Sequence, residues 1–250
     1  MEHYLLSPTT SQVFSTNALP ERERFDFWMD VVCRTLLKLD FEYREPKPFF
    51  GELRHSRFAG IELVEMRARP HVFFRTRKHL SQLDQDAMVM SIPLTATSNK
   101  RVNSLCLPSV KGDISFYDGS REQELNVQSE IHALVIQVPK VLFDDHLRDV
   151  SSFDATIVPT ATPLGRLVSD FFLQVIHAMP RYGKDEKIAA RDMFLSMLSI
   201  SLTNKYKNTL ELSDVKQGVL TQVKNYIREH CHTQDQTPAQ IALRFHMSIR

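Results

Sequence analysis

The sequence predicts an α+β protein in which a β-barrel with flanking helices is followed by a truncated all-α helix-turn-helix domain. Between Phe41 and Val138, short runs rich in Val, Ile and Phe alternate with polar residues and are separated by turn signals, a texture typical of strands. After Pro139 the apolar residues recur at helical spacing. The residues from Val219 to Arg250 then contain a helix, a short break and the start of another helix.

Composition limits the class of protein. With 250 residues, of which 42% are hydrophobic and 24% charged, the chain can form one sizeable core and one smaller domain. The formal net charge of +1 does not by itself indicate nucleic-acid binding. The chain has only 7 glycines and neither the G-x-G-x-x-G nor the G-x-x-x-x-G-K-[ST] pattern, which argues against a nucleotide-binding fold.

The cysteines and the N-terminus indicate a cytoplasmic protein. Cys33, Cys106 and Cys231 are far apart in the sequence and form no C-x-x-C motif, so a reducing compartment is expected. No apolar run is long enough for a transmembrane helix, and the first residues show no basic, apolar signal pattern. We therefore expect no membrane partner.

The N-terminal part is expected to contain a loose arm and one helix. Residues 1–19 are polar and rich in Ser and Thr, which predicts a flexible arm. Pro20 is suited to opening a helix, and acidic and basic residues occupy the first turns. The helix is predicted to run to about Leu39, with one apolar side: Phe25, Trp28, Val32, Leu36 and Leu39.

The middle of the chain is predicted to form a small barrel or sandwich. The clearest turns are Lys111-Gly112-Asp113 and Asp118-Gly119-Ser120. Strands are predicted over five ranges: 60–66, 71–75, 87–92, 113–117 and 131–136.

Two helices and a linker follow. The first helix carries a single apolar stripe: Leu164, Leu167, Val168, Phe171, Val175 and Met179. The second runs from about Asp185 to Lys205. We therefore divide the chain into the arm of residues 1–19, a domain of residues 20–206, a polar linker of residues 207–218 and a helix-turn-helix region of residues 219–250.

The C-terminal region carries capping signals for two successive helices. The Thr237 hydroxyl is placed to cap a free backbone N–H, Pro238 fits the first helical position, and Gln240 is placed to reach back to the cap. Ser248 then stands where a second N-cap belongs. Helix pairs of this kind commonly lay the second helix in the DNA major groove, and here Arg250 is its last residue.

Four residues of the β-region are candidates for binding a ligand: Phe73, Arg75, Met90 and Phe116. Arg75 lies in an apolar strand, and a buried arginine needs partners. The partner is either the carboxylate of an effector or an internal acid such as Asp113 or Glu65; the third alternative is exposure of Arg75 at a strand end. The apolar candidates either line a barrel interior or belong to the ordinary core.

No catalytic residue, metal site or cofactor is expected. His230-Cys231-His232 are adjacent in a predicted helix, so their side chains diverge. His55, His71, His79 and His132 occur singly, without a close H-x-H and a following carboxylate, which leaves a metal-dependent enzyme without support. The G-x-S-x-G pattern of a nucleophilic serine is also absent.

The order of these motifs resembles the AraC/XylS family of bacterial transcriptional regulators. The C-terminal similarity lies in Asn225-Tyr226-Ile227-Arg228-Glu229-His230, Thr237-Pro238-Ala239-Gln240-Ile241-Ala242 and Met247-Ser248-Ile249-Arg250. The N-terminal region is similar to the cupin-like sensor domain in a branch of that family, at Phe14-Ser15-Thr16, Phe50-Gly51, Phe73-Phe74-Arg75-Thr76, Gly112-Asp113-Ile114 and Val138-Pro139-Lys140.

The resemblance implies a regulator that binds a small effector in the sensor barrel, forms a homodimer through the helices after it, and binds DNA in its full-length form. Ser248 would cap the recognition helix against a phosphate, Arg250 would face the groove, and Thr237 would stabilise the supporting helix and contact a phosphate. Because the chain as given ends at the first recognition helix, we expect it to lack specific DNA binding. The alternative is a truncated ligand-binding or dimerisation module that modulates a full-length regulator.

Overall fold

The computed structural model describes residues 4–80, 86–95, 98–102, 105–147 and 149–204. The chain divides into two compact units, Met1–Ser201 and Leu202–Arg250. The predicted linker of residues 207–218 and the helix-turn-helix region of residues 219–250 lie outside the described residues. The description below therefore concerns the first unit. No helix in the described part of the chain is both long and apolar enough to cross a membrane.

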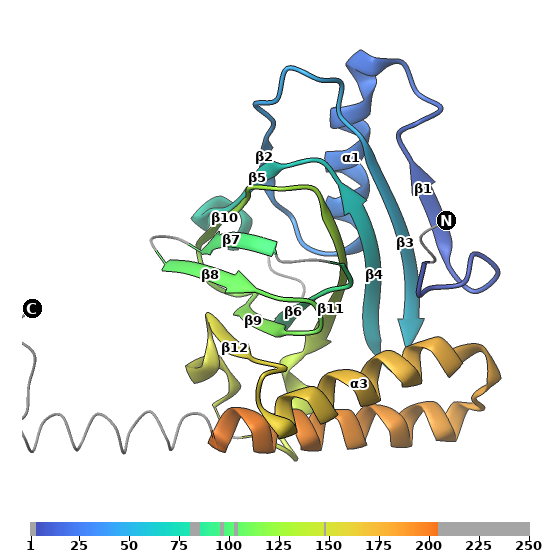
Figure 1. Cartoon of the computed structure of the whole chain (residues 1–250), viewed down its shortest axis with the longest axis vertical. Coiled ribbons are helices and arrows are strands. Elements are labelled where there is room, and N and C mark those ends of the chain that lie inside the picture. Colours follow the sequence, from blue (N-terminus) through green and yellow to red (C-terminus); the bar gives the residue numbers. More distant parts are fainter. Residues whose placement is uncertain (1–3, 81–85, 96–97, 103–104, 148, 205–250) are drawn as a thin grey trace, which may run out of the picture. The chain divides into compact units, whose positions relative to one another are not determined.

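The strands form two antiparallel sheets (Figure 1). The large sheet has seven strands in the order β1-β3-β4-β11-β6-β9-β12, and the small sheet has five in the order β2-β5-β10-β7-β8. The strands are β1 (Gln12–Ser15), β2 (Asp40–Glu42), β3 (Gly51–Phe58), β4 (Ile61–Ala68), β5 (His71–Arg75), β6 (Ala87–Pro93), β7 (Ser98–Val102), β8 (Leu105–Ser109), β9 (Ile114–Asp118), β10 (Gln123–Val127), β11 (Ile131–Pro139) and β12 (Thr156–Val158).

The helical elements of the described residues are fewer than the strands. They are α1 (Glu21–Thr35), α2 (Arg77–Leu80), η1 (Lys140–Phe143), η2 (Val150–Phe153), α3 (Pro163–Ala178) and η3 (Met179–Arg181), together with a helix over residues 184–204.

The predicted closed barrel is wrong, although the mixed α+β class and the cupin-like sheet arrangement are confirmed. Among the described strands no hydrogen-bonded ladder joins the two sheets. The space along one side is filled instead by the apolar face of α1, whose Trp28, Val31 and Val32 pack with residues of both sheets. The edge strands β1, β2 and β12 are only three or four residues long, too short to continue the sheets around a barrel.

All five predicted strands are confirmed, each within three residues at either end. The sharpest turn is the two-residue connection of β3 and β4, where Phe58 pairs with Ile61. Ala59 and Gly60 both have positive φ, of 47° and 87°, as a tight hairpin of right-handed twist requires. Gly112, in the predicted turn Lys111-Gly112-Asp113, also has a φ of 87°.

The predicted flexible arm is wrong for the residues that the structure describes. Gln12–Ser15 form β1, which pairs with β3 along four residues. Leu6 is only 1% exposed, and the backbone N–H groups of Leu5 and Leu6 donate to the carboxylate of Glu65 at 2.9 and 2.7 Å. The polar composition concealed these contacts because β1 lies at a sheet edge, where polar side chains are tolerated.

The predicted first helix is confirmed as α1, although it ends at Thr35 instead of about Leu39. Pro20 directly precedes it, acidic Glu21 and Glu23 lie in its first turn and basic Arg34 in its last, which suits the helix dipole. The buried face of α1 packs directly on Gly51 of β3, where an added Cβ would overlap the ring of Trp28. Glycine is thus required for close approach of helix and strand.

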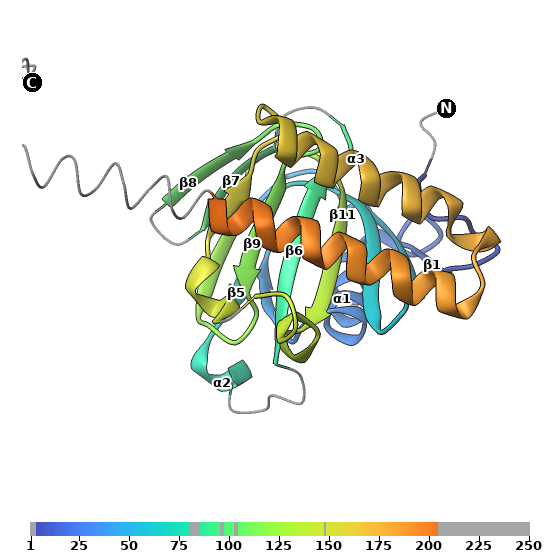
Figure 2. The ribbon, with the colours of Figure 1, turned by 90° about the horizontal axis from the view of Figure 1, so that it is seen from below.

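The two predicted later helices are confirmed as α3 and the helix of residues 184–204. They lie side by side across the strands of the large sheet (Figure 2). Thr162 caps α3 by accepting from the Gly165 N–H at 3.1 Å, with Pro163 at the first helical position. Phe172 and Phe194 stack between the two helices with ring centroids 3.9 Å apart.

The predicted stripe on α3 is only half right. Val168, Val175 and Met179 are buried, but Leu167 is 56% exposed and the fully buried Phe172 was not in the stripe. The buried face is therefore rotated, and an apolar residue is left on the outer side of the helix.

Candidate functional site

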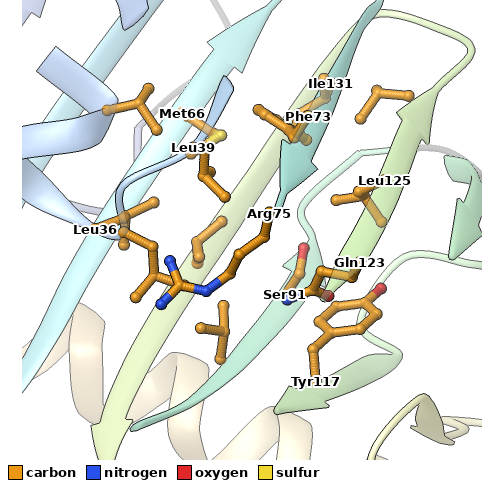
Figure 3. A pocket seen from close by; sticks show the side chains of 15 residues that line it. Leu36, Leu39, Met66, Phe73, Arg75, Ser91, Tyr117, Gln123, Leu125 and Ile131 are labelled. Carbon is orange, nitrogen blue, oxygen red and sulfur yellow. The ribbon is translucent and has the colours of Figure 1, made fainter. Parts of the chain in front are cut away.

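A cavity lies between the inner faces of the two sheets, beside the end of α1 (Figure 3). About 730 Å³ within it is free of protein atoms, part of which opens to solvent. Its apolar lining comes from α1 and the segment after it, from β4, β6 and β11 of the large sheet, and from β5 and β10 of the small sheet: Val32, Leu36, Leu37, Leu39, Met66, Phe73, Val89, Leu125, Val127, Ile131 and Val135.

Four polar side chains interrupt this apolar wall, namely Arg75, Ser91, Tyr117 and Gln123. Arg75 on β5 and Gln123 on β10 are direct partners in the strand register. A mostly apolar cavity with a few convergent polar groups is the usual form of a small-molecule site.

Arg75 is a buried cation with few protein partners. It is 3% exposed, its Nη1 donates to the Lys38 carbonyl at 2.9 Å, and its Nε has no hydrogen-bond partner among the described residues. Burial lowers the pKa of the guanidinium, and the charge of Asp118 raises that pKa by a smaller amount.

The internal ion pairs considered for Arg75 do not form. Asp113 instead accepts from the backbone N–H and hydroxyl of Thr160 at 2.7 and 2.8 Å. Glu65 is occupied by the N-terminal segment and by His132. The third alternative, exposure of Arg75 at a strand end, is also wrong.

Tyr117 brings a second buried polar group to the cavity. It is 3% exposed, and its hydroxyl has no hydrogen-bond partner of good geometry among the described residues. Burial raises the pKa of Tyr117 to about 12, while the nearby Ser115 side chain lowers it by less. The phenol is therefore neutral and available as a donor.

Of the four predicted ligand-binding residues, the structure brings Phe73 and Arg75 to the cavity and places Met90 and Phe116 elsewhere. Phe73 and Arg75 are two positions apart on β5 and share its inner face. Met90 and Phe116 are paired across β6 and β9, but they point to the opposite side of the large sheet. There Phe116 meets Phe143 edge to face at 6.0 Å.

The residues that line the cavity in their place are immediate sequence neighbours. Val89 and Ser91 flank Met90, and Tyr117 follows Phe116. A change of one position in a strand exchanges inside for outside. One sequence feature could have indicated which side of these strands faces the cavity. Ser91 and Ser115 are small polar residues next to apolar ones, and the structure pairs them across β6 and β9.

The four histidines of the β-region are each engaged separately. His55 pairs with Glu62 at 2.6 Å and His132 with Glu65 at 2.8 Å. His71 contacts the Arg69 carbonyl at 2.6 Å, and His79 bonds to the backbone and side chain of Thr76. No group of three His, Cys, Asp or Glu side chains suited to a metal ion occurs in the described ranges.

The predicted DNA-binding residues Thr237, Ser248 and Arg250 lie outside the described residues.

Two antiparallel sheets around an inner cavity, with helices covering the outer face of one, define a cupin-like domain. The chain belongs to the AraC-binding-like domain family, whose model matches residues 28–202. This confirms the resemblance to regulators of the AraC family.

Two relatives are similar over most of the chain. The crystal structure of the AraC-like transcriptional activator CuxR has a TM-score of 0.66 and 12% sequence identity, over 96% of this chain and 85% of that one. A protein from Bacillus sp. (strain OxB-1), described as an uncharacterized protein in the nit 5' region, is 22% identical over 90% of this chain and 88% of its own length.

Proposed function

We propose that the chain senses a small effector in the inter-sheet cavity and belongs to a cytoplasmic, DNA-binding transcriptional regulator of the AraC/XylS type. The observation that carries this proposal is the cavity itself. It is apolar, it contains the incompletely bonded Arg75 and Tyr117, and it lies within the family's matched domain.

The large sheet offers a route from the cavity to the covering helices. Val89 and Tyr117 face the cavity, whereas Met90 and Phe116 on the same two strands face the opposite side. A ligand that shifts the inner residues of β6 and β9 must also shift the outer ones, because both belong to the same backbone. Effector binding then favours one arrangement of the helices over another.

We propose that those helices form a homodimer interface. Leu167 on α3, and Met193 and Ile200 on the helix of residues 184–204, are 56%, 55% and 54% exposed. Large apolar side chains exposed on neighbouring helices favour association with a second copy.

DNA contact is assigned to Thr237, Ser248 and Arg250. In a form of the protein that binds DNA, Arg250→Ala is expected to weaken retention of the bound duplex in a gel-shift assay. Ser248→Ala and Thr237→Ala should weaken binding more evenly across sequences, since both residues are assigned to phosphates. Unchanged, salt-insensitive retention by all three variants would contradict the assignment.

The cavity is tested with a neutral apolar dye and a variant that fills it. Nile red is expected to bind the wild-type chain and to gain fluorescence, and Val135→Phe should abolish this because Val135 lines the cavity. Val110→Phe is the matched control, since Val110 is 49% exposed and does not line the cavity. Equal dye binding by wild type and Val135→Phe would refute the cavity as the ligand site.

A further inference from the structure

The charge of Arg75 is not matched by any carboxylate of its own. No described Asp or Glu lies within ion-pairing distance of its guanidinium, and its one hydrogen bond goes to a backbone carbonyl. Burying a cation without a partner is costly. A site that keeps such a group is prepared for an anion supplied from outside.

The acid that influences Arg75 most, Asp118, is already engaged. Its carboxylate accepts from the Ser120 N–H and hydroxyl at 2.9 and 2.6 Å. Lys140 Nζ lies 2.9 Å from it and Arg121 Nε 3.5 Å. These two cations also pair with Asp86 and Asp154, at 2.7 and 3.3 Å. Asp118 is thus held in a network of its own and forms no ion pair with the Arg75 guanidinium among the described residues.

The small number of polar groups in the cavity limits how polar its ligand is. Among the described residues, Arg75, Ser91, Tyr117 and Gln123 are the ones that bring polar side chains to the lining. A sugar or another polyhydroxylated molecule needs many more partners than these. A dianionic phosphate would bring two negative charges to a lining in which Arg75 is the one cation among the described residues.

We infer that the effector is a small amphipathic carboxylate, with its head on Arg75 and its hydrocarbon body between the two sheets. This inference rests on the proposed sensing function of the cavity. Arginine is suited to a carboxylate because its planar N–H groups donate in parallel. The neutral Tyr117 hydroxyl supplies a further donor for an acceptor on the ligand.

The test compares ligands that differ only in the head group. Isothermal titration calorimetry of the whole chain with octanoate and with cyclohexanecarboxylate should show binding by at least one of them. The corresponding amides, octanamide and cyclohexanecarboxamide, are expected to bind at least about tenfold more weakly, since hydrogen bonds to charged groups are the stronger ones.

The variants assign this preference to Arg75. Arg75→Gln should weaken carboxylate binding at least about tenfold and leave amide binding much less changed, whereas Arg75→Lys should restore part of the loss. Arg57→Gln is the matched control, because the Arg57 side chain is 80% exposed. Arg75 also holds the Lys38 carbonyl, so a second variant is needed in case Arg75→Gln folds poorly.

Tyr117→Phe provides that second variant. The hydroxyl has no hydrogen-bond partner of good geometry among the described residues, so its removal should leave the unfolding free energy unchanged or raised. Carboxylate affinity should nevertheless fall. Tyr43→Phe, which removes a hydroxyl that donates to the Lys47 carbonyl at 2.6 Å, is the control and should not alter binding.

The outcomes separate this inference from the function on which it rests. If the amides bind as tightly as the carboxylates, or if neither carboxylate binds while Nile red does, the carboxylate inference is overturned and the sensing cavity stands. If Val135→Phe leaves Nile red binding intact, the cavity function itself fails. A preference for carboxylates that is lost in Arg75→Gln and kept in Arg57→Gln supports the inference.

Discussion

Acid should destabilise this protein through His71. The ring is 3% exposed and lies among aromatic side chains: Trp28, Phe41, Phe49 and Phe73. Its Nδ1 lies 2.6 Å from the Arg69 carbonyl, to which it donates, and its Nε2 accepts from the Trp28 indole N–H at 3.4 Å. Protonation would place a second N–H at Nε2, facing the indole donor. The neutral ring is thus the form that fits.

Burial lowers the pKa of His71 from its ordinary value of 6.5 to about 4, and the Arg69 carbonyl opposes this only in part. In the unfolded chain the ring takes up a proton as the pH falls through about 6.5, whereas the folded protein resists until about 4. The stability present above the higher value is therefore lost across this window. At about 1.4 kcal/mol per pKa unit, the loss amounts to roughly 3 kcal/mol.

Urea unfolding followed by tryptophan fluorescence measures this directly, because Trp28 is the single tryptophan. Wild type and His71→Gln should be compared from about pH 7 to about pH 4; glutamine keeps an acceptor for the indole and does not titrate. The wild-type unfolding free energy should fall by roughly 3 kcal/mol more than that of the variant. Parallel curves would refute the reasoning. His177→Gln, at an exposed position of α3, is the control and should follow wild type.

Three further predictions concern packing and assembly. Glu65→Ala should lower the unfolding free energy by about 3 kcal/mol or more in urea titrations, because it removes a fully buried acceptor of three hydrogen bonds. Gly51→Ala should cost about 1–3 kcal/mol by differential scanning calorimetry, because its Cβ would lie 2.8 Å from ring carbons of Trp28. Leu167→Asp should shift the chain from dimer to monomer in light scattering, because a charge at a dimer interface is costly.

Each of these has a matched control. Glu23→Ala changes an acid whose side chain is 52% exposed, and Gly183→Ala adds a Cβ whose nearest neighbour would be 3.5 Å away; both should leave stability nearly unchanged. Val141→Asp places a charge at a residue that is 69% exposed and should not alter the mass of the particle. Equal effects in a variant and its control would contradict the structural reason given for it.

Sequence periodicity predicted the elements well because burial and spacing agree in them. The strand of residues 71–75 was predicted with its final bounds, and its alternation placed Phe73 and Arg75 together on the correct face. The same alternation could not decide between Met90 and its neighbours in β6. That strand is buried on both faces, so apolar residues alone do not indicate which face meets the cavity.

Contacts between distant segments could not be predicted from the sequence, for a different reason. Glu65 receives the N–H groups of Leu5 and Leu6, which lie about sixty residues away in the chain. Nothing in a polar N-terminal segment marks such a backbone donor, because every residue except proline carries one. The prediction of a flexible arm relied on its polar side chains, whereas its backbone N–H groups and the buried Leu6 hold the segment in place.

The same double burial of β6 and β9 is what makes the large sheet suited to signalling. An exposed sheet would let a displaced Tyr117 relax into water, at no cost to the other side. Here Phe116, its neighbour, is fully buried against Phe143, and close-packed side chains do not yield without moving their neighbours. A ligand that displaces Tyr117 therefore changes the packing under the helices. Because β6 and β9 are buried on both faces, their cavity-facing residues could not be predicted from the sequence, and the same double burial lets these strands connect the cavity with the proposed dimer surface.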